Sequence, residues 1–149
     1  ANGLDFDTGI TVSNGGLNAP IGDMVRYLAF LLGRHPAAAG PAPVLARASL
    51  EGMWRPLLSS AAGETSGDTV GTGFFIRNRD GIRLIGHTGS QRGFRSFFYA
   101  APERGVAVIA AFNTAPADER PGVSPQIAVL REGLLERLTR GIFPLFPPR

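Results

Sequence analysis

Cysteine and lysine are both absent from this sequence of 149 residues. Without cysteine the chain has no disulfide, no thiolate nucleophile and no cysteine-based metal site. All 15 basic residues are arginine and are scattered singly, so the net charge of +3 does not predict nucleic-acid binding. The two histidines, His35 and His87, lie far apart, and no phosphate-binding glycine loop occurs. We therefore expect neither a metal nor a cofactor.

Long apolar runs are missing too. The longest candidate, from Met24 to Leu32, is interrupted by Arg26 and is far shorter than the ~20 residues of a membrane helix. Residues 1–16 lack the basic start and apolar run of a signal peptide. The first residue is Ala1, so we expect that a leader has been removed or that the chain is part of a longer protein.

The sequence does contain a helical part over residues 12–69. Apolar residues at helical spacing predict a helix over 19–33 that ends near Gly33: Ile21, Met24, Leu28 and Leu31. Residues 36–43 consist of alanine, proline and glycine and predict a surface loop. A short helix capped by Ser49 and ended by Pro56 should follow, and then a polar loop over 59–69.

Antiparallel strands are predicted over residues 70–113. The Asp80-Gly81 pair favours a hairpin turn, and a second tight turn should form at 102–105. The last strand is wholly apolar and β-branched, which is typical of a central strand covered on both faces. The expected strands are Val70 to Arg77, Ile82 to His87, Phe94 to Ala100 and Val106 to Phe112.

A final helix is predicted over residues 123–141, with Ser124 as N-cap and Pro125 as its first residue. Its apolar stripe should consist of Ile127, Leu130, Leu134 and Leu138. The fold class is therefore α+β, with an antiparallel sheet flanked by helices in one domain over residues 1–149. A sheet with a central strand buried on both faces needs more cover than these helices give, so the chain reads as half of a larger fold.

The residues that bear chemistry lie where the strand Ile82 to His87 ends. The segment His87-Thr88-Gly89-Ser90 occupies the end of that strand and the turn into the next. It resembles the third motif, K-T-G or H-T-G, of the serine β-lactamase and penicillin-binding-protein superfamily, in particular its class C-like branch. The resemblance extends over residues 12–140, through features that occur in the same order: Gly15-Gly16-Leu17, Asp23, Gly93-Phe94, Pro102 and the apolar strand that ends at Asn113.

This resemblance implies the C-terminal half of a β-lactamase/transpeptidase-like fold. In such enzymes the residue after the triplet, here Ser90, donates a backbone N–H to the oxyanion that forms during acyl transfer. Gly89 leaves room for substrate, Thr88 offers a hydroxyl, and His87 offers a group that titrates near neutral pH. The alternative is that the glycines only shape a hairpin and that His87 is an ordinary surface histidine.

The family's nucleophile lies in an S-x-x-K motif, which a chain without lysine cannot contain. Neither Tyr27 nor Tyr99 begins a Y-x-N motif, and we interpret Ser13-Asn14 as part of a loop rather than as S-x-N. Arg92 and Arg95 are candidates for a substrate carboxylate, although solvated arginine is the simpler interpretation. The aromatic residues Trp54, Phe97, Phe98 and Tyr99 should be core or interface residues.

We therefore expect a portion of a serine hydrolase that acts on a D-alanyl peptide, a β-lactam or a small ester, and that is inactive alone. Its partners would be a small-molecule or peptide substrate, together with a missing N-terminal portion or a second copy of itself at an open sheet edge. The alternative function is a non-catalytic binding module that retains part of the fold. The resemblance favours a periplasmic or secreted protein but does not fix the compartment.

Overall fold

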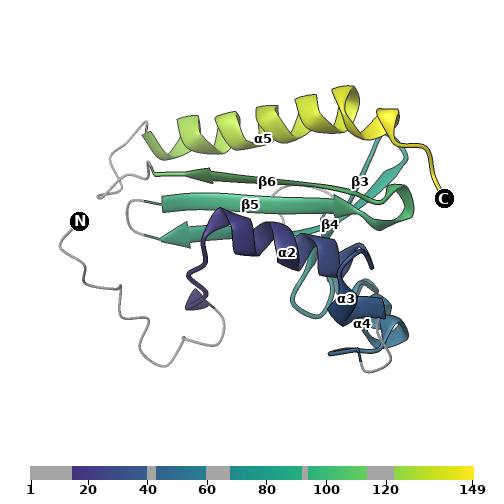
Figure 1. Cartoon of the computed structure of the whole chain (residues 1–149). Coiled ribbons are helices and arrows are strands. Elements are labelled where there is room, and N and C mark those ends of the chain that lie inside the picture. Colours follow the sequence, from purple (N-terminus) through teal and green to yellow (C-terminus); the bar gives the residue numbers. More distant parts are fainter. Residues whose placement is uncertain (1–14, 40–42, 60–67, 92–93, 114–122) are drawn as a thin grey trace.

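The chain folds into a six-stranded sheet in which every strand pairs with its neighbours in the sequence, in the order β1-β2-β3-β4-β5-β6 (Figure 1). All five pairings are antiparallel. This computed structural model describes residues 15–39, 43–59, 68–91, 94–113 and 123–149. The strands are β1 (Leu58–Ser59), β2 (Thr69–Val70), β3 (Phe75–Arg79), β4 (Ile82–Gln91), β5 (Phe94–Ala101) and β6 (Val106–Phe112). The predicted α+β class and the antiparallel meander are therefore correct.

Helices cover both faces of the sheet, with α2 on one face and α5 on the other (Figure 1). Each helix packs on its own apolar core. Leu28 and Leu31 of α2 join Ile85 and Phe98 of the sheet in one cluster. Leu135 of α5 joins the second cluster, on the opposite face. The helices are α2 (Ile21–Leu31), α3 (Pro36–Ala39), α4 (Arg47–Met53) and α5 (Val123–Gly141), with 3-10 turns η2 (Pro102–Arg104) and η3 (Phe143–Leu145).

Helix α2 ends as the sequence predicts. Gly33 has a φ of +70°, which a glycine adopts at no steric cost. The following Arg34 N–H donates to the carbonyl of Ala29, and the Gly33 N–H donates to Phe30. The Arg47 guanidinium donates to the Leu31 carbonyl at 2.7 Å and so satisfies another acceptor at this helix end.

Two expectations for the following segment are wrong. The predicted loop over 36–43 contains the one-turn helix α3, where the ring nitrogen Nδ1 of His35 accepts the N–H of Ala37 at 3.2 Å. A histidine at the N-cap thus replaces the usual Ser or Asp. The next helix begins at Arg47 after Ala46, not after Ser49, and it has no side-chain cap.

The predicted strand from Val70 to Arg77 is interrupted. The backbone leaves the strand conformation at Gly71, and the N–H of Thr72 donates to the Met53 carbonyl at the end of α4. A side chain at Gly71 would overlap that same carbonyl oxygen. Close packing against α4 therefore divides the run into β2 and β3. The expected loop over 59–69 includes ends of the short strands β1 and β2, while its residues 60–67 lie outside the described ranges.

The hairpin between β3 and β4 is confirmed in detail. Asp80 and Gly81 have φ values of +51° and +76°, and both are positive, as a tight two-residue turn with the twist of the strands requires. The sequence predicts a central strand at Val106–Phe112. Among the described strands this segment, β6, is the last in the sheet and pairs with β5 alone, and most of its residues are partly exposed.

Helix α5 spans the predicted range, but its buried face is rotated around the helix axis relative to the predicted stripe. Leu135 and Thr139 are buried, whereas Leu130, which was expected in the apolar stripe, is 56% exposed. Ser124 and Pro125 fall inside the helix, which begins at Val123. In the described part of the chain, no helix is long and apolar enough to cross a membrane.

Candidate functional site

The candidate residues His87, Thr88, Gly89 and Ser90 lie within strand β4. The sequence placed His87 at the end of this strand and the other three in the turn after it, but the structure continues β4 to Gln91 and pairs all four with β5. The strand is longer than expected because the ladder to β5 persists as far as the pair Gln91 and Phe94. A regular strand fixes backbone direction, so these residues are held more rigidly than a turn would hold them.

The pairing register assigns the candidate residues to opposite faces. Residues directly opposite one another in an antiparallel pair share a face. His87 is opposite Phe98, which belongs to the core under α2, and Thr88 is opposite Phe97, which belongs to the core under α5. By alternation His87 and Gly89 share the face of α2, and Thr88 and Ser90 share the face of α5.

One edge of β4 is open at the candidate site. Strand β3 pairs with β4 only as far as Phe75 opposite Gly86. From His87 to Gln91, none of the described strands pairs with that edge of β4. Within the described residues this is therefore a strand edge without a neighbouring strand, and such edges can bind an extended ligand through main-chain hydrogen bonds.

The ring of His87 is held in place by two neighbours. Its Nδ1 lies 2.7 Å from the carbonyl oxygen of Thr88, and the ring stacks on Phe75 with centroids 5.0 Å apart. A carbonyl only accepts, so this contact is a hydrogen bond when the proton is on Nδ1. The neutral ring then has Nε2 as an acceptor, which could take a proton from a reacting group.

Two glycines of β4, which we call the motif strand, differ in how closely other atoms approach them. A Cβ atom at Gly86 would overlap the Phe98 carbonyl oxygen and the ring of Tyr99. At Gly89 a Cβ atom would overlap only the hydroxyl of Ser96, on the neighbouring strand β5. The sequence indicated that Gly89 makes room for substrate; in the structure the space beside it holds a serine hydroxyl that can rotate away.

The other candidate residues are only partly described. Arg95 on β5 is directly opposite Ser90, so it lies at the motif strand. Arg92, Ser13 and Asn14 lie outside the described residues, and their predicted roles remain predictions. Trp54, Phe97, Phe98 and Tyr99 are buried, as expected for core residues. Among the described residues, no group of three or more His, Asp or Glu side chains could hold a metal.

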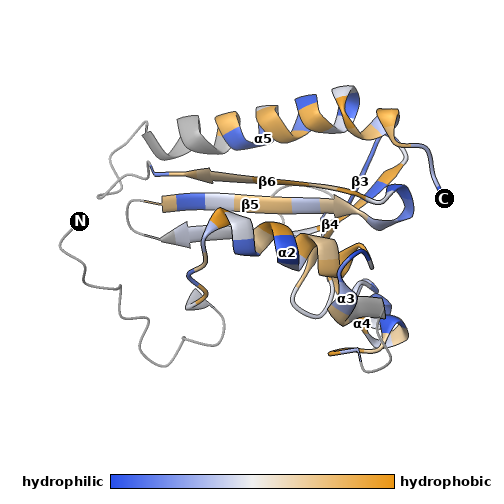
Figure 2. Cartoon of the chain, viewed as in Figure 1, coloured by the Kyte–Doolittle hydropathy of each residue, from blue (hydrophilic) through white to orange (hydrophobic). Residues whose placement is uncertain are grey.

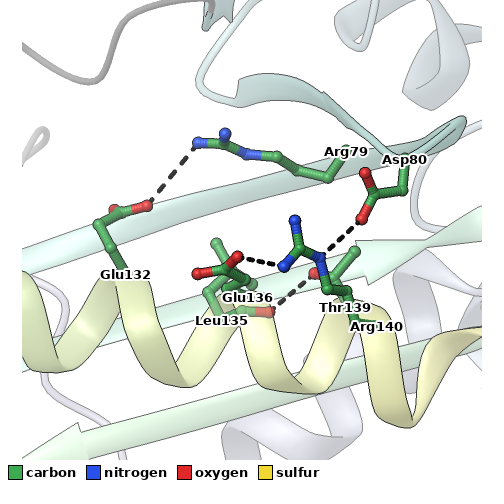
Figure 3. Close-up of a pocket in the computed structure, with 7 residues that line it drawn as sticks. All are labelled: Arg79, Asp80, Glu132, Leu135, Glu136, Thr139 and Arg140. Atoms are coloured by element: carbon green, nitrogen blue, oxygen red, sulfur yellow. Dashed lines mark hydrogen bonds and ion pairs between the residues drawn. The ribbon is translucent and has the colours of Figure 1, made fainter.

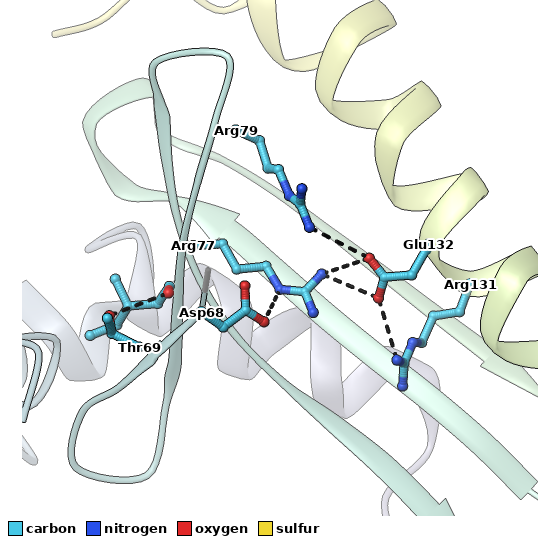
Figure 4. A network of polar contacts seen from close by, with 7 residues as sticks. Asp68, Thr69, Arg77, Arg79, Arg131 and Glu132 are labelled. Atoms are coloured by element: carbon cyan, nitrogen blue, oxygen red, sulfur yellow. Dashed lines mark hydrogen bonds and ion pairs between the residues drawn. The ribbon is translucent and has the colours of Figure 1, made fainter. Parts of the chain in front are cut away.

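A buried charge network lies on the face of α5, and sequence reasoning missed it (Figure 4). The Arg77 guanidinium contacts Asp68 at 2.6 Å and Glu132 of α5 at 2.9 Å. The side chains of Arg77 and Asp68 are only 2% and 4% exposed. Arg77 also lies over the ring of Tyr99, 4.9 Å from its centroid. An arginine directly after the apolar residues Phe75 and Ile76, within the predicted strand, was the available signal, because a buried arginine requires a carboxylate.

Burial raises the pKa of Tyr99 to about 12, and the nearby Arg77 only partly opposes this effect. The Tyr99 hydroxyl is buried and makes no hydrogen bond with any residue that the structure describes. This tyrosine is therefore an apolar ring with a neutral hydroxyl, rather than an acid or base for catalysis.

A hollow of about 380 Å³ lies between the β3–β4 turn and α5, away from the motif strand (Figure 3). The charged groups around it pair with one another. Arg140 contacts both Asp80, at 3.1 Å, and Glu136, at 2.6 Å, and Arg79 lies 3.8 Å from Glu132. The pairs Arg140–Asp80 and Arg79–Glu132 link α5 to the hairpin, which is a structural role.

Comparisons with known proteins agree with this geometry. The family model described as Beta-lactamase matches residues 1–131. Among solved structures, the chain is similar to the octameric penicillin-binding protein homologue from Pyrococcus abyssi, with a TM-score of 0.56 and 20% identity. That match covers 78% of this chain and 24% of the other, so this chain spans about a quarter of the length of that relative. No curated protein matches. The match over most of its length shows that the chain belongs to the beta-lactamase family.

Proposed function

We propose that this chain supplies one wall of the active site of a serine hydrolase that works through an acyl-enzyme. The observation that carries the proposal is the open edge of β4 from His87 onward, in a chain of the beta-lactamase family. The nucleophile and its base would come from a portion outside this sequence, because the family's S-x-x-K motif needs a lysine and this chain has none.

Each motif residue has a chemical task in this proposal. Negative charge develops on the carbonyl oxygen during acyl transfer, and the backbone N–H of Ser90, held on a rigid strand, would stabilise it. Gly89 and Thr88 would line the substrate. His87 would present Nε2 as a proton acceptor, with its ring orientation set by Phe75 and the Thr88 carbonyl.

The substrate is an amide or ester with an acyl group that a serine can accept. A D-alanyl peptide, a β-lactam and a small ester all satisfy this requirement. An extended peptide would use the β4 edge most fully, because main-chain hydrogen bonds to a strand edge suit a ligand with its own backbone.

The first test uses the chain alone with a fluorescent penicillin, a chromogenic β-lactam and a p-nitrophenyl ester. We expect neither covalent labelling nor hydrolysis, because no lysine activates a serine here. Stoichiometric acylation of one serine, located by mass spectrometry, would contradict the assignment of the nucleophile to another portion.

The second test uses a chain extended by a portion that bears S-x-x-K. We expect His87→Ala to lower kcat/KM by about 100-fold or more, the usual contribution of a general acid or base. The matched control is His35→Ala, since His35 caps α3 and contacts no motif residue in the described ranges. Equal effects of the two substitutions would contradict a catalytic role for His87 and would favour a binding module.

A further inference from the structure

The two histidines of the chain use the same ring nitrogen in opposite ways. Nδ1 of His35 accepts the backbone N–H of Ala37 at 3.2 Å, so this nitrogen carries no proton. Nδ1 of His87 lies 2.7 Å from the carbonyl oxygen of Thr88, which can only accept, so here Nδ1 carries the proton. In the neutral rings, Nε2 therefore carries the proton in His35 and a lone pair in His87.

A contact at one nitrogen does not by itself fix the plane of a histidine ring. Rotation about χ2 of histidine has broad minima, so a single hydrogen bond leaves the ring some freedom to turn. A second contact restrains His87, because its ring stacks on Phe75 with centroids 5.0 Å apart and planes 22° from parallel. This separation lies in the range that aromatic pairs favour. Together the two contacts set both the plane of the ring and the direction of Nε2.

The strand register explains why Phe75 reaches this ring. Phe75 is the first residue of β3, and it pairs with Gly86, the residue directly before His87. Gly86 has no side chain, so no cross-strand side chain competes for the phenyl ring at this position. The ladder between β3 and β4 ends at this pair, which places Phe75 beside the first residue of the motif.

We propose that Phe75 is a positioning residue for His87, and that its ring holds the imidazole with the proton on Nδ1 and the lone pair on Nε2. A proton taken up at Nε2 leaves the bond from Nδ1 to the Thr88 carbonyl in place, and the positive charge then strengthens that bond. His87 can therefore accept a proton without changing its orientation.

A fixed direction of Nε2 matters for catalysis, because a general base must lie within hydrogen-bond reach of the proton that it removes. This catalytic consequence rests on the proposed function. The tautomer and the orientation of the ring are properties of the chain itself, so they can be measured without a substrate.

NMR of the chain with isotope-labelled histidine rings tests the tautomers. At about pH 9 an ordinary histidine is neutral, and long-range correlations between ring protons and ring nitrogens then show which nitrogen is protonated. We expect the proton on Nδ1 in His87 and on Nε2 in His35, which serves as the internal reference because it caps α3. The variant His35→Ala assigns the two sets of signals. A proton on Nε2 of His87 would overturn the proposal.

Substitution of Phe75 tests its positioning role. Phe75→Leu keeps an apolar side chain but removes the stacked ring, so the His87 signals should move towards a mixture of tautomers and lose the shift that a stacked phenyl ring causes. Phe75→Tyr keeps the ring and should keep the spectrum of the unaltered chain. The control is Phe146→Leu, since Phe146 is exposed and ends η3, and it should leave His87 unaffected. Circular dichroism verifies that the variants fold.

A chain extended by a portion that bears S-x-x-K separates this inference from the proposed function. We expect Phe75→Leu to lower kcat by about tenfold with little change in KM, because a misdirected base slows proton transfer rather than binding. Phe75→Tyr should retain the activity. Disturbed His87 signals with an unchanged kcat would support the positioning role and contradict the catalytic role of His87. Unchanged His87 signals in Phe75→Leu would overturn the positioning role, whatever the activity of the extended chain.

Discussion

The two faces of the sheet are held by different kinds of contact. Under α2 the described contacts are mainly apolar, with Leu31 and Trp54 among the most buried side chains. Figure 2 shows the hydropathy of the residues along both helices and the sheet. Under α5 an apolar core is combined with the Arg77 network, which joins the sheet to the helix by charge. The candidate residue His87 shares the face of α2, whereas the Arg77 network on the other face links the sheet to α5. Substitutions that affect one face and spare the other test this division.

The largest loss of stability should follow from a substitution in the Arg77 network, on the face of the sheet that α5 covers. Arg77→Met keeps most of the side-chain volume but removes the ion pairs with Asp68 and Glu132. Loss of one member of a buried ion pair costs about 3–5 kcal/mol of unfolding free energy. Urea denaturation measures the loss. Arg140→Met is the control, because its ion pairs are exposed and their loss should leave the midpoint unchanged.

A smaller loss of stability should distinguish substitutions of the two glycines Gly86 and Gly89 in β4. Gly86→Ala places a methyl group against a backbone carbonyl and the ring of Tyr99, and overpacking of this kind costs about 1–3 kcal/mol. Gly89→Ala meets only the Ser96 hydroxyl, which can rotate, so it should cost clearly less. Thermal unfolding of both variants checks the order. Equal losses would show that the space at Gly89 is as restricted as that at Gly86.

The smallest effect concerns Tyr99 at high pH. Its pKa is about 12 in the folded chain and about 10 when unfolded, so folding is favoured while the phenol stays protonated. That stability is present below pH 10 and is lost as the pH rises towards 12. At pH 11 the loss should be about 1.4 kcal/mol, one pKa unit of linkage.

Tyr99→Phe removes this pH dependence, because phenylalanine cannot ionise. Denaturation at pH 8 should give nearly the same stability for both proteins, since the hydroxyl has no hydrogen-bond partner among the described residues. At pH 11 the variant should be the more stable protein. A parallel decline of both proteins between pH 8 and pH 11 would argue against a buried, neutral Tyr99.

Local sequence signals predicted most of the fold. The Asp80-Gly81 turn, the end of α2 at Gly33 and the limits of β6 all follow from backbone preferences of a few neighbouring residues. Errors arose where contacts between segments far apart in the sequence determine the local structure. The carbonyl of Met53 diverts the chain at Gly71, and the charge network links Arg77 to Glu132, which is 55 residues away.

For the candidate site too, local features were predicted from the sequence and contacts between distant segments were not. The H-T-G triplet and Ser90 were found from their order in the sequence, because the motif is continuous. The stacking of Phe75 on His87 was not predicted, since it depends on the register between β3 and β4. Family membership is established by the comparison, whereas the roles of the four motif residues remain predictions.

The meander order of the sheet has a consequence for how the chain reaches its structure. Every strand pairs with the next one along the sequence, so each pairing closes only a short loop and loses little chain entropy. Folds rich in such local contacts form quickly. The contacts of α5 with β3 span a much longer separation, and we expect them to form late. A slow final phase of refolding should then report the docking of this helix, after the hairpins have already assembled.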